Sequence, residues 1–268
     1  MTKFLILASP SDETALRTGL LLSRRHGPDA VAIRTPDELL LATWEHRLSA
    51  EGVGARVVMH DGTRLPEPGE AVVLNRLTSV EPLQFAGAPA ADQNYATMES
   101  LALVVSWLFA FGPRAVNPPA PAALCGGVYR PMVWQALAAR AGFATLELSA
   151  SSSTRRFPAP PGHAAREDID RLRDPHAHMA INTFQWRSQP LPDRRRPVFV
   201  MGERVLGDVP ATTARASARL AELAGVSLLK IELDEHGAFL AADPCPALPP
   251  GAALTALAEF LESRLEAA

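Results

Sequence analysis

Short apolar runs alternate with helically spaced apolar positions along the first 117 residues of the chain. Such runs are typical of strands that are buried on both faces of a parallel sheet; they are Lys3–Ala8, Ala30–Arg34 and Glu70–Asn75. Apolar positions at helical spacing predict helices between them, over Thr14–Arg25 and from Thr35 to about Ser49. This alternation predicts an α/β sandwich with a parallel sheet.

Two further signals complete this first half. The turn residues His60–Asp61–Gly62 predict an antiparallel hairpin over Ala55–Leu65. The stretch Asp92–Phe109 predicts a long, strongly apolar helix, and a turn then leads into a short strand, Arg114–Val116. Because that strand stops on Asn117, we place the end of the first domain there.

The second half, residues 118–268, begins with a Pro- and Gly-rich loop and then predicts a mixture of helices and short strands. The predicted helices are Tyr129–Ala141, Ala211–Ala224 and Ala252–Leu265. The predicted strands are Phe143–Leu148, Pro197–Met201, Val205–Leu206, Ser227–Leu233 and Ala238–Ala242.

The segment Ser149–Arg196 is broken by prolines and has no sustained periodicity. We expect it to be rich in loops, with one short helix near Ala164–Arg173 and a strand at Met179–Trp186.

Composition excludes several classes of function. A net charge of −3 over 268 residues gives no long-range attraction to nucleic acid or to an anionic membrane. No apolar run approaches the ~20 residues of a membrane span, and the N-terminus is typical of a strand and not of a signal peptide. Cys125 and Cys245 lack any CxxC or Cys/His spacing, so we expect reduced thiols in a cytoplasmic protein.

Lysine is nearly absent, because the chain has 24 arginines but only Lys3 and Lys230. A mechanism that holds phosphates with several lysines would have to work with these two or with arginines. Arginine binds phosphate through its planar fork and is not an equivalent replacement.

An ordered set of segments resembles proteins of the ATP-grasp superfamily of the RimK-like type, which includes peptide and amino-acid ligases. The segments are Val72–Arg76 (VVLNR), Ala115–Pro119 (AVNPP), Val198–Leu206 (VFVMGERVL), Arg219–Leu233 (RLAELAGVSLLKIEL) and Ala238–Pro246 (AFLAADPCP). The resemblance implies an N-terminal pre-ATP-grasp-like parallel-sheet domain, 1–117, and a truncated ATP-grasp-like α+β domain, 118–268. Residues 151–196 stand where the family has the subdomain that covers the triphosphate, and they lack its Gly-rich loop and lysine.

The resemblance also implies a metal site, and here the chain departs from the family. The glutamate of the family's metal-binding motif falls on Ala241, which has no ligand atom, and its asparagine falls on Asp243. The other family acid falls on Glu232. Mg²⁺ on nucleotide phosphates usually needs one or two carboxylates, so Glu232 and Asp243 are the candidate metal ligands.

Four further residues are candidates for ATP or substrate contacts. By the resemblance, Arg130 stands near the position of a family lysine, and Arg130 and Arg204 would lie near phosphates and act in catalysis. Arg76 follows a strand whose carboxyl end could meet an acidic substrate, and a surface role for it is equally open. Asn117 is a candidate ligand contact, although capping of the following turn is the stronger alternative.

Two functions therefore stand. The chain is a degenerate, non-catalytic binding or partner subunit in a small-molecule, peptide or cofactor biosynthetic pathway, and Ala241 and the missing lid favour this reading. Alternatively, it is an ATP- and Mg²⁺-dependent carboxylate–amine ligase that works through an acyl phosphate. Expected partners are a small-molecule or peptide substrate or another protein, and a homo-oligomer such as a dimer stays open.

Overall fold

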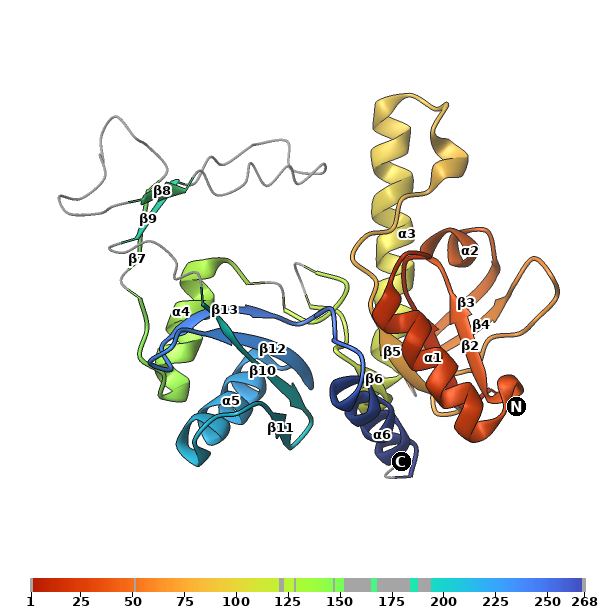
Figure 1. Cartoon of the computed structure of the whole chain (residues 1–268). Helices are drawn as coiled ribbons and strands as arrows, with labels where there is room; N and C mark the ends of the chain where they lie inside the picture. The colour runs from red at the N-terminus through yellow and green to blue at the C-terminus, as the bar shows by residue number, and fades with distance from the viewer. Residues whose placement is uncertain are drawn as a thin grey trace.

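A four-stranded parallel sheet forms the centre of the N-terminal half (Figure 1). The computed structural model describes residues 2–50, 52–120, 123–127, 129–146, 148–151, 165–167, 184–187 and 194–266. The strand order is β2–β1–β5–β6, and the bounds are β1 Phe4–Leu7, β2 Val31–Arg34, β5 Val72–Asn75 and β6 Ala115–Val116. All three pairings are parallel, as the apolar runs predicted.

Both faces of this sheet are covered, which explains why its central strands are apolar at every position. Phe4 and Ile6 point to the face covered by α1 (Glu13–His26) and the C-terminal helix α6 (Ala252–Glu266). Leu5 and Leu7 point to the opposite face, which is covered by the long helix α3 (Ala90–Ala110) and by a hairpin. Successive side chains alternate between faces because a strand has a period of two.

That hairpin replaces part of a predicted helix. Helix α2 (Pro36–Leu40) starts after Thr35, which caps it, but makes only about one turn, and the prediction of a helix to Ser49 is wrong. Strand β3 (Thr43–Ser49) instead pairs antiparallel with β4 (Gly52–Val58). The Trp44 side chain packs edge-on against Trp107 with ring centroids 5.2 Å apart, so tertiary packing overrides the local helical pattern.

The predicted hairpin over Ala55–Leu65 is correspondingly small. The main partner of β4 is β3, and the turn at His60–Asp61–Gly62 is closed by a single antiparallel bridge between Val58 and Arg64. Three short 3-10 helices complete this half; they are η1 Pro28–Ala30, η2 Leu83–Phe85 and η3 Gly112–Arg114.

The second half is built on an antiparallel sheet with strand order β11–β10–β12–β13. Its elements follow the predicted pattern closely; they are β10 Arg196–Met201, β11 Arg204–Leu206, β12 Leu228–Leu233, β13 Phe239–Asp243, α4 Pro131–Ala141 and α5 Ala211–Ala224. Helices α4 and α5 cover one face, where their apolar side chains pack on Leu229 and Ile231. Gly142 and Gly225 end these helices in the left-handed conformation that glycine adopts without strain.

A small antiparallel sheet, β7–β9–β8, stands beyond α4 in Figure 1. Its strands are β7 Leu148–Ser151, β8 Ala165–Glu167 and β9 Phe184–Arg187. The helix predicted near Ala164–Arg173 is therefore wrong over β8, and residues 168–173 lie outside the described residues. The strand predicted at Met179–Trp186 is observed only from Phe184 onward, because residues 179–183 also lie outside the described residues.

The strand predicted over Phe143–Leu148 lies later in the chain, since β7 begins at Leu148 and Thr145 makes only an isolated bridge to Phe239.

The two halves share one of the apolar cores. Side chains from β1 and β5 pack in the same cluster as Phe199, Met201 and the apolar face of α6. The last helix of the chain therefore returns to cover the first sheet, beside α1 (Figure 1). Among the described residues, no helix is both long and apolar enough to cross a membrane.

Candidate functional site

Polar side chains from the carboxyl ends of β5 and β6 meet at the junction between the two halves, which we call the joint (Asn75, Arg76 and Asn117 with Asp12). Parallel neighbouring strands end at the same edge of a sheet, so these residues are brought together by topology. All three of the strand-end residues are buried, with exposed fractions of 1% for Asn75, 5% for Arg76 and 0% for Asn117.

Asn117 uses every hydrogen-bonding position of its amide within the protein. Its Nδ2 donates to the carbonyl oxygens of Leu228 and Pro244, each at 2.6 Å. Its Oδ1 accepts from the backbone N–H groups of Ser227 at 2.8 Å and Leu228 at 2.9 Å. The residue has a φ of 52°, a left-handed conformation that asparagine tolerates better than most residues. Asn117 thus fastens β6 to the start of β12 and to the loop after β13.

Asn75 extends the same network along the other strand. Its Nδ2 donates to the carbonyl oxygens of Asn117 at 3.0 Å and Leu124 at 2.6 Å, and its Oδ1 accepts from the Leu77 N–H. Buried amides need such partners, because an unpaired buried donor or acceptor costs about 1–3 kcal/mol.

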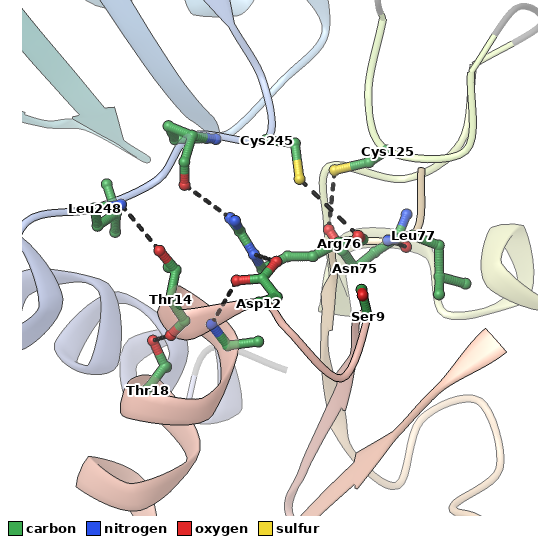
Figure 2. A network of polar contacts seen from close by, with 12 residues as sticks. Ser9, Asp12, Thr14, Thr18, Asn75, Arg76, Leu77, Cys125, Cys245 and Leu248 are labelled. Carbon is green, nitrogen blue, oxygen red and sulfur yellow. Dashed lines mark hydrogen bonds and ion pairs between the residues drawn. The ribbon is translucent and has the colours of Figure 1, made fainter. Parts of the chain in front are cut away.

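Arg76 forms a buried ion pair with Asp12, with Nε 2.7 Å from Oδ2 (Figure 2). Its Nη1 also donates to the carbonyl of Pro246 at 3.0 Å. Asp12 is the N-cap of α1, and its Oδ1 accepts from the Ala15 N–H at 2.9 Å. Burial alone would lower the pKa of Arg76, but the neighbouring Cys245 and Asp12 raise it above its ordinary value, so the guanidinium stays charged.

A second group of polar residues lies on the sheet of the C-terminal half, and we call it the charged sheet face (Lys230, Glu232 and Asp243, with Ala241). In the antiparallel register Lys230 pairs with Asp243 and Glu232 pairs with Ala241. Residues directly opposite each other, and residues two apart on one strand, share a face. The predicted metal ligands Glu232 and Asp243 are therefore brought to one face, which is the face opposite α4 and α5.

Two cationic side chains form ion pairs with the Glu232 carboxylate. Lys230 Nζ donates to Oε1 at 2.7 Å, and Arg195 donates to Oε2 at 2.9 Å. These partners, Lys230 foremost, lower the pKa of Glu232, and partial burial of the carboxylate opposes that shift. Asp243 is exposed, and its Oδ1 accepts from the N–H of Cys245 at 2.8 Å.

This donor set, as arranged, does not fit a magnesium ion. Lys230 and Arg195 take both oxygens of Glu232, and Ala241 offers no ligand atom at the opposite position. Within the part of the chain that the structure describes, no three His, Cys, Asp or Glu side chains are grouped so that they could hold a metal. The metal-binding role of Glu232 and Asp243 stays a prediction.

Neither of the other two candidate residues makes a hydrogen bond or ion pair with the described residues of the joint or of the charged sheet face. Arg130 is exposed at the N-cap position of α4, where its side chain makes no capping hydrogen bond. Arg204 pairs with Glu259 on α6 at 2.6 Å. Arg204 pairs with Met201 at one end of β10, whereas Glu232 pairs with Pro197 near its other end, so Arg204 and Glu232 lie beside opposite ends of that strand. The catalytic and phosphate-binding roles of these arginines stay predictions.

Sequence reasoning missed Lys230 and the two cysteines. A signal for Lys230 was present, because one of only two lysines stands two residues from Glu232 on a predicted strand. Nothing in the spacing of Cys125 and Cys245 indicated that they meet, yet both lie against the joint (Figure 2).

Comparisons with known proteins found likeness only in structure, because no family model and no curated protein matches the chain. The ATP-grasp ligase PsnB in complex with its minimal precursor is 16% identical, with a TM-score of 0.73 over 98% of this chain and 99% of that one. The macrocyclase MdnC of Microcystis aeruginosa, bound with precursor peptide MdnA, is 12% identical, with a TM-score of 0.72 over 97% and 99%.

A RimK domain ATP-grasp protein from Sphaerobacter thermophilus aligns over 98% of this chain and 99% of its own, at 13% identity and a TM-score of 0.52. At such identities the likeness establishes the fold alone. The fold agrees with the segment order that the sequence indicated, with a parallel sheet first and an antiparallel sheet after it. The chain therefore has the ATP-grasp fold.

Proposed function

We propose that this chain is a non-catalytic protein of the ATP-grasp fold that binds a peptide and acts as a partner subunit in a biosynthetic pathway. The observation that carries the proposal is the state of Glu232. Its carboxylate is neutralised by Lys230 and Arg195, and the opposite position on β13 is Ala241.

The positive charges around Glu232 disfavour the binding of Mg·ATP. A divalent cation entering beside Glu232 would meet an ammonium and a guanidinium that are already within 3 Å of the carboxylate. Repulsion between the incoming metal ion and these two cationic side chains disfavours metal binding. Displacing the two side chains would break their charge-assisted hydrogen bonds to the carboxylate. Lys230 thus supplies permanently, from within the chain, the positive charge that a metal would bring.

The peptide part of the proposal is supported by the proteins of similar structure. PsnB and MdnC were solved with precursor peptides, and a RiPP-associated ATP-grasp ligase from Chryseobacterium gregarium was solved with a leader and core peptide. Each alignment covers at least 97% of this chain. A fold that keeps its peptide-binding surfaces while losing its metal ligands would still recruit a substrate for another enzyme.

Calorimetry with Mg²⁺ and the non-hydrolysable nucleotide AMPPNP tests the first half of the proposal. The wild-type chain is expected to give no binding heat up to millimolar nucleotide. Micromolar binding that is lost in Glu232→Ala and kept in the control variant Glu259→Ala would overturn the non-catalytic assignment. Glu259 is a suitable control because it is also an acid paired with an arginine, but it lies on α6 and its partner Arg204 lies beside the other end of β10 from Glu232.

Selection from a displayed random peptide library against the immobilised chain tests the second half. We expect enrichment of related peptides that bind the free chain in solution without nucleotide, measured by fluorescence polarisation. Failure to enrich any peptide family, with a folded chain on the support, would contradict the peptide-binding role while leaving the nucleotide result intact.

The alternative function is an ATP-dependent carboxylate–amine ligase, and one observation favours it. Glu232 and Asp243 lie on one sheet face in adjacent strands, as a pair of metal ligands would. Phosphate release from ATP that depends on both Mg²⁺ and a selected peptide would establish this alternative. The Asp243→Ala variant is expected to abolish such release if it exists.

A further inference from the structure

The only two cysteines of the chain meet at the joint, although 120 positions separate Cys125 from Cys245. Cys125 lies in the loop after β6, and Cys245 lies in the loop after β13. The Cys125 Sγ donates to the carbonyl of Asn75 at 3.0 Å, and the Cys245 Sγ lies 4.0 Å from the next carbonyl, that of Arg76. Both sulfurs therefore reach the same peptide segment from two different loops (Figure 2).

Cys125 also lies beside the peptide bond that precedes Cys245. Its Sγ is 3.9 Å from the carbonyl oxygen of Pro244, the residue directly before Cys245. Cys125 is only 3% exposed, whereas Cys245 is partly accessible. Cys245 is therefore the thiol that a peroxide can reach, and Cys125 is its buried partner.

We propose that Cys125 and Cys245 form a reversible thiol–disulfide modification site that reacts with peroxides and fastens the two halves of the protein together. The placement of both sulfurs on consecutive carbonyls at the joint carries this inference. It is independent of the function proposed above, because neither cysteine belongs to the charged sheet face.

The chemistry balances in two steps. The Cys245 thiolate attacks one oxygen of hydrogen peroxide, the O–O bond breaks, and the products are a sulfenic acid on Cys245 and water once a proton is taken up. The Cys125 sulfur then attacks the sulfenic sulfur, an S–S bond forms, and a second water leaves with the Cys125 proton. Two electrons pass from the sulfurs to the peroxide, and a dithiol returns them to restore both thiols.

The disulfide would link the loop after β6, which is bonded to the end of β5, to the loop after β13. Cys125 is held to the end of β5 by its bond to Asn75, and Cys245 follows β13 directly. Cys245 also donates its backbone N–H to Asp243, so fixing Cys245 would fix one end of the charged sheet face. Because the link closes a long loop, the oxidised chain is expected to melt higher by on the order of 5 °C.

Peptide mapping of the full wild-type chain after hydrogen peroxide treatment is the decisive experiment. We expect both free thiols to be lost together, a linked peptide pair containing Cys125 and Cys245 within one chain, and full recovery after dithiothreitol. Disulfides formed only between chains, or both thiols left free at peroxide concentrations that oxidise partly exposed cysteines, would overturn the proposal.

Two single variants test the assigned order of events. In Cys125→Ala, Cys245 should accumulate as a sulfenic acid that dimedone labels. In Cys245→Ala, Cys125 should resist peroxide under the same conditions. Faster labelling of Cys125 than of Cys245 would overturn the assignment of Cys245 as the attacking group. If either variant fails to fold, the comparative rates of thiol alkylation in the wild-type chain decide the same question.

Discussion

The joint and the charged sheet face contain similar kinds of side chain but place them in opposite environments. At the joint, Asn117 and Arg76 are buried, and each bonds only to other parts of the chain. On the charged sheet face, Asp243 is exposed, and Glu232 is neutralised at the surface of a sheet. The polar groups of the joint connect buried parts of the fold, whereas those of the charged sheet face lie near solvent.

The difference teaches how the position where such sheets usually bind ligands can be filled by the protein itself. The carboxyl ends of parallel strands are where open α/β sheets usually bind ligands. Here the loop after β13 enters that space, and the carbonyls of Pro244 and Pro246 accept from Asn117 and Arg76. Polar residues at strand ends therefore bind either a ligand or another loop of the same chain, and the sequence pattern is the same in both cases.

Replacing Asn117 should give the largest effect of any change that tests this comparison. Asn117→Ala leaves two carbonyls and two N–H groups of the buried joint without partners, so we expect a loss of at least about 4 kcal/mol of unfolding free energy. Urea denaturation measures it. Asn117→Gly separates the causes, because glycine relieves the positive φ and should recover only about 1 kcal/mol.

An unchanged denaturation midpoint in Asn117→Ala would show that the joint does not hold the halves together. The residue would then return to the list of ligand-binding candidates.

Arg76 should come second. Arg76→Ala leaves Asp12 without its charged partner in a largely buried site, and we expect destabilisation of about 3–5 kcal/mol. Arg17→Ala is the matched control, because Arg17 pairs with Glu13 in an exposed setting worth less than about 1 kcal/mol. Thermal or urea unfolding of both variants checks the contrast. Equal effects would mean that burial of the Arg76 pair adds nothing.

The charged sheet face can be tested by adding a carboxylate to it. In Ala241→Glu a second carboxylate stands opposite Glu232, where facing residues lie about 5 Å apart at Cβ. We expect Mg²⁺ affinity to rise about tenfold, or about 1.4 kcal/mol, and to rise again when Lys230→Met removes the competing cation. Calorimetric titration with MgCl₂ measures it. No gain in the double variant would show that this face is not a degenerate metal site.

The smallest expected effect is the pH dependence of Glu232. The pKa of its carboxyl is lowered in the folded chain, so its stabilising contribution is complete above the ordinary value of 4.5. That contribution is lost as pH falls through the lower folded pKa. Glu232→Gln should therefore cost less than about 1 kcal/mol at pH 7, and the difference from wild type should vanish in acid. Urea denaturation across the acidic range measures both. A difference that persists below the folded pKa would argue against a charged interaction.

Periodicity predicted most of the fold because burial dictates it directly. The strands of the parallel sheet and helices α1, α3, α4, α5 and α6 lie close to their expected ranges. The main error, Thr43–Ser49, arose because a Trp and Leu at helical spacing also suit a hairpin that packs on α3. Which period wins depends on the partner that Trp44 finds, and that partner, Trp107, is distant in sequence.

The sequence by itself determined the order of elements, the caps at Asp12 and Thr35, and the presence at position 241 of an alanine, which has no metal-ligating atom. These follow from local propensity and from the identity of single residues. Only the tertiary structure decided that Asn117 and Arg76 bond within the protein, that Lys230 neutralises Glu232, and that Cys125 and Cys245 lie against consecutive carbonyls. Such partners belong to loops and strands far apart along the chain, and their contacts exist only once burial in a shared core has fixed how the two halves pack.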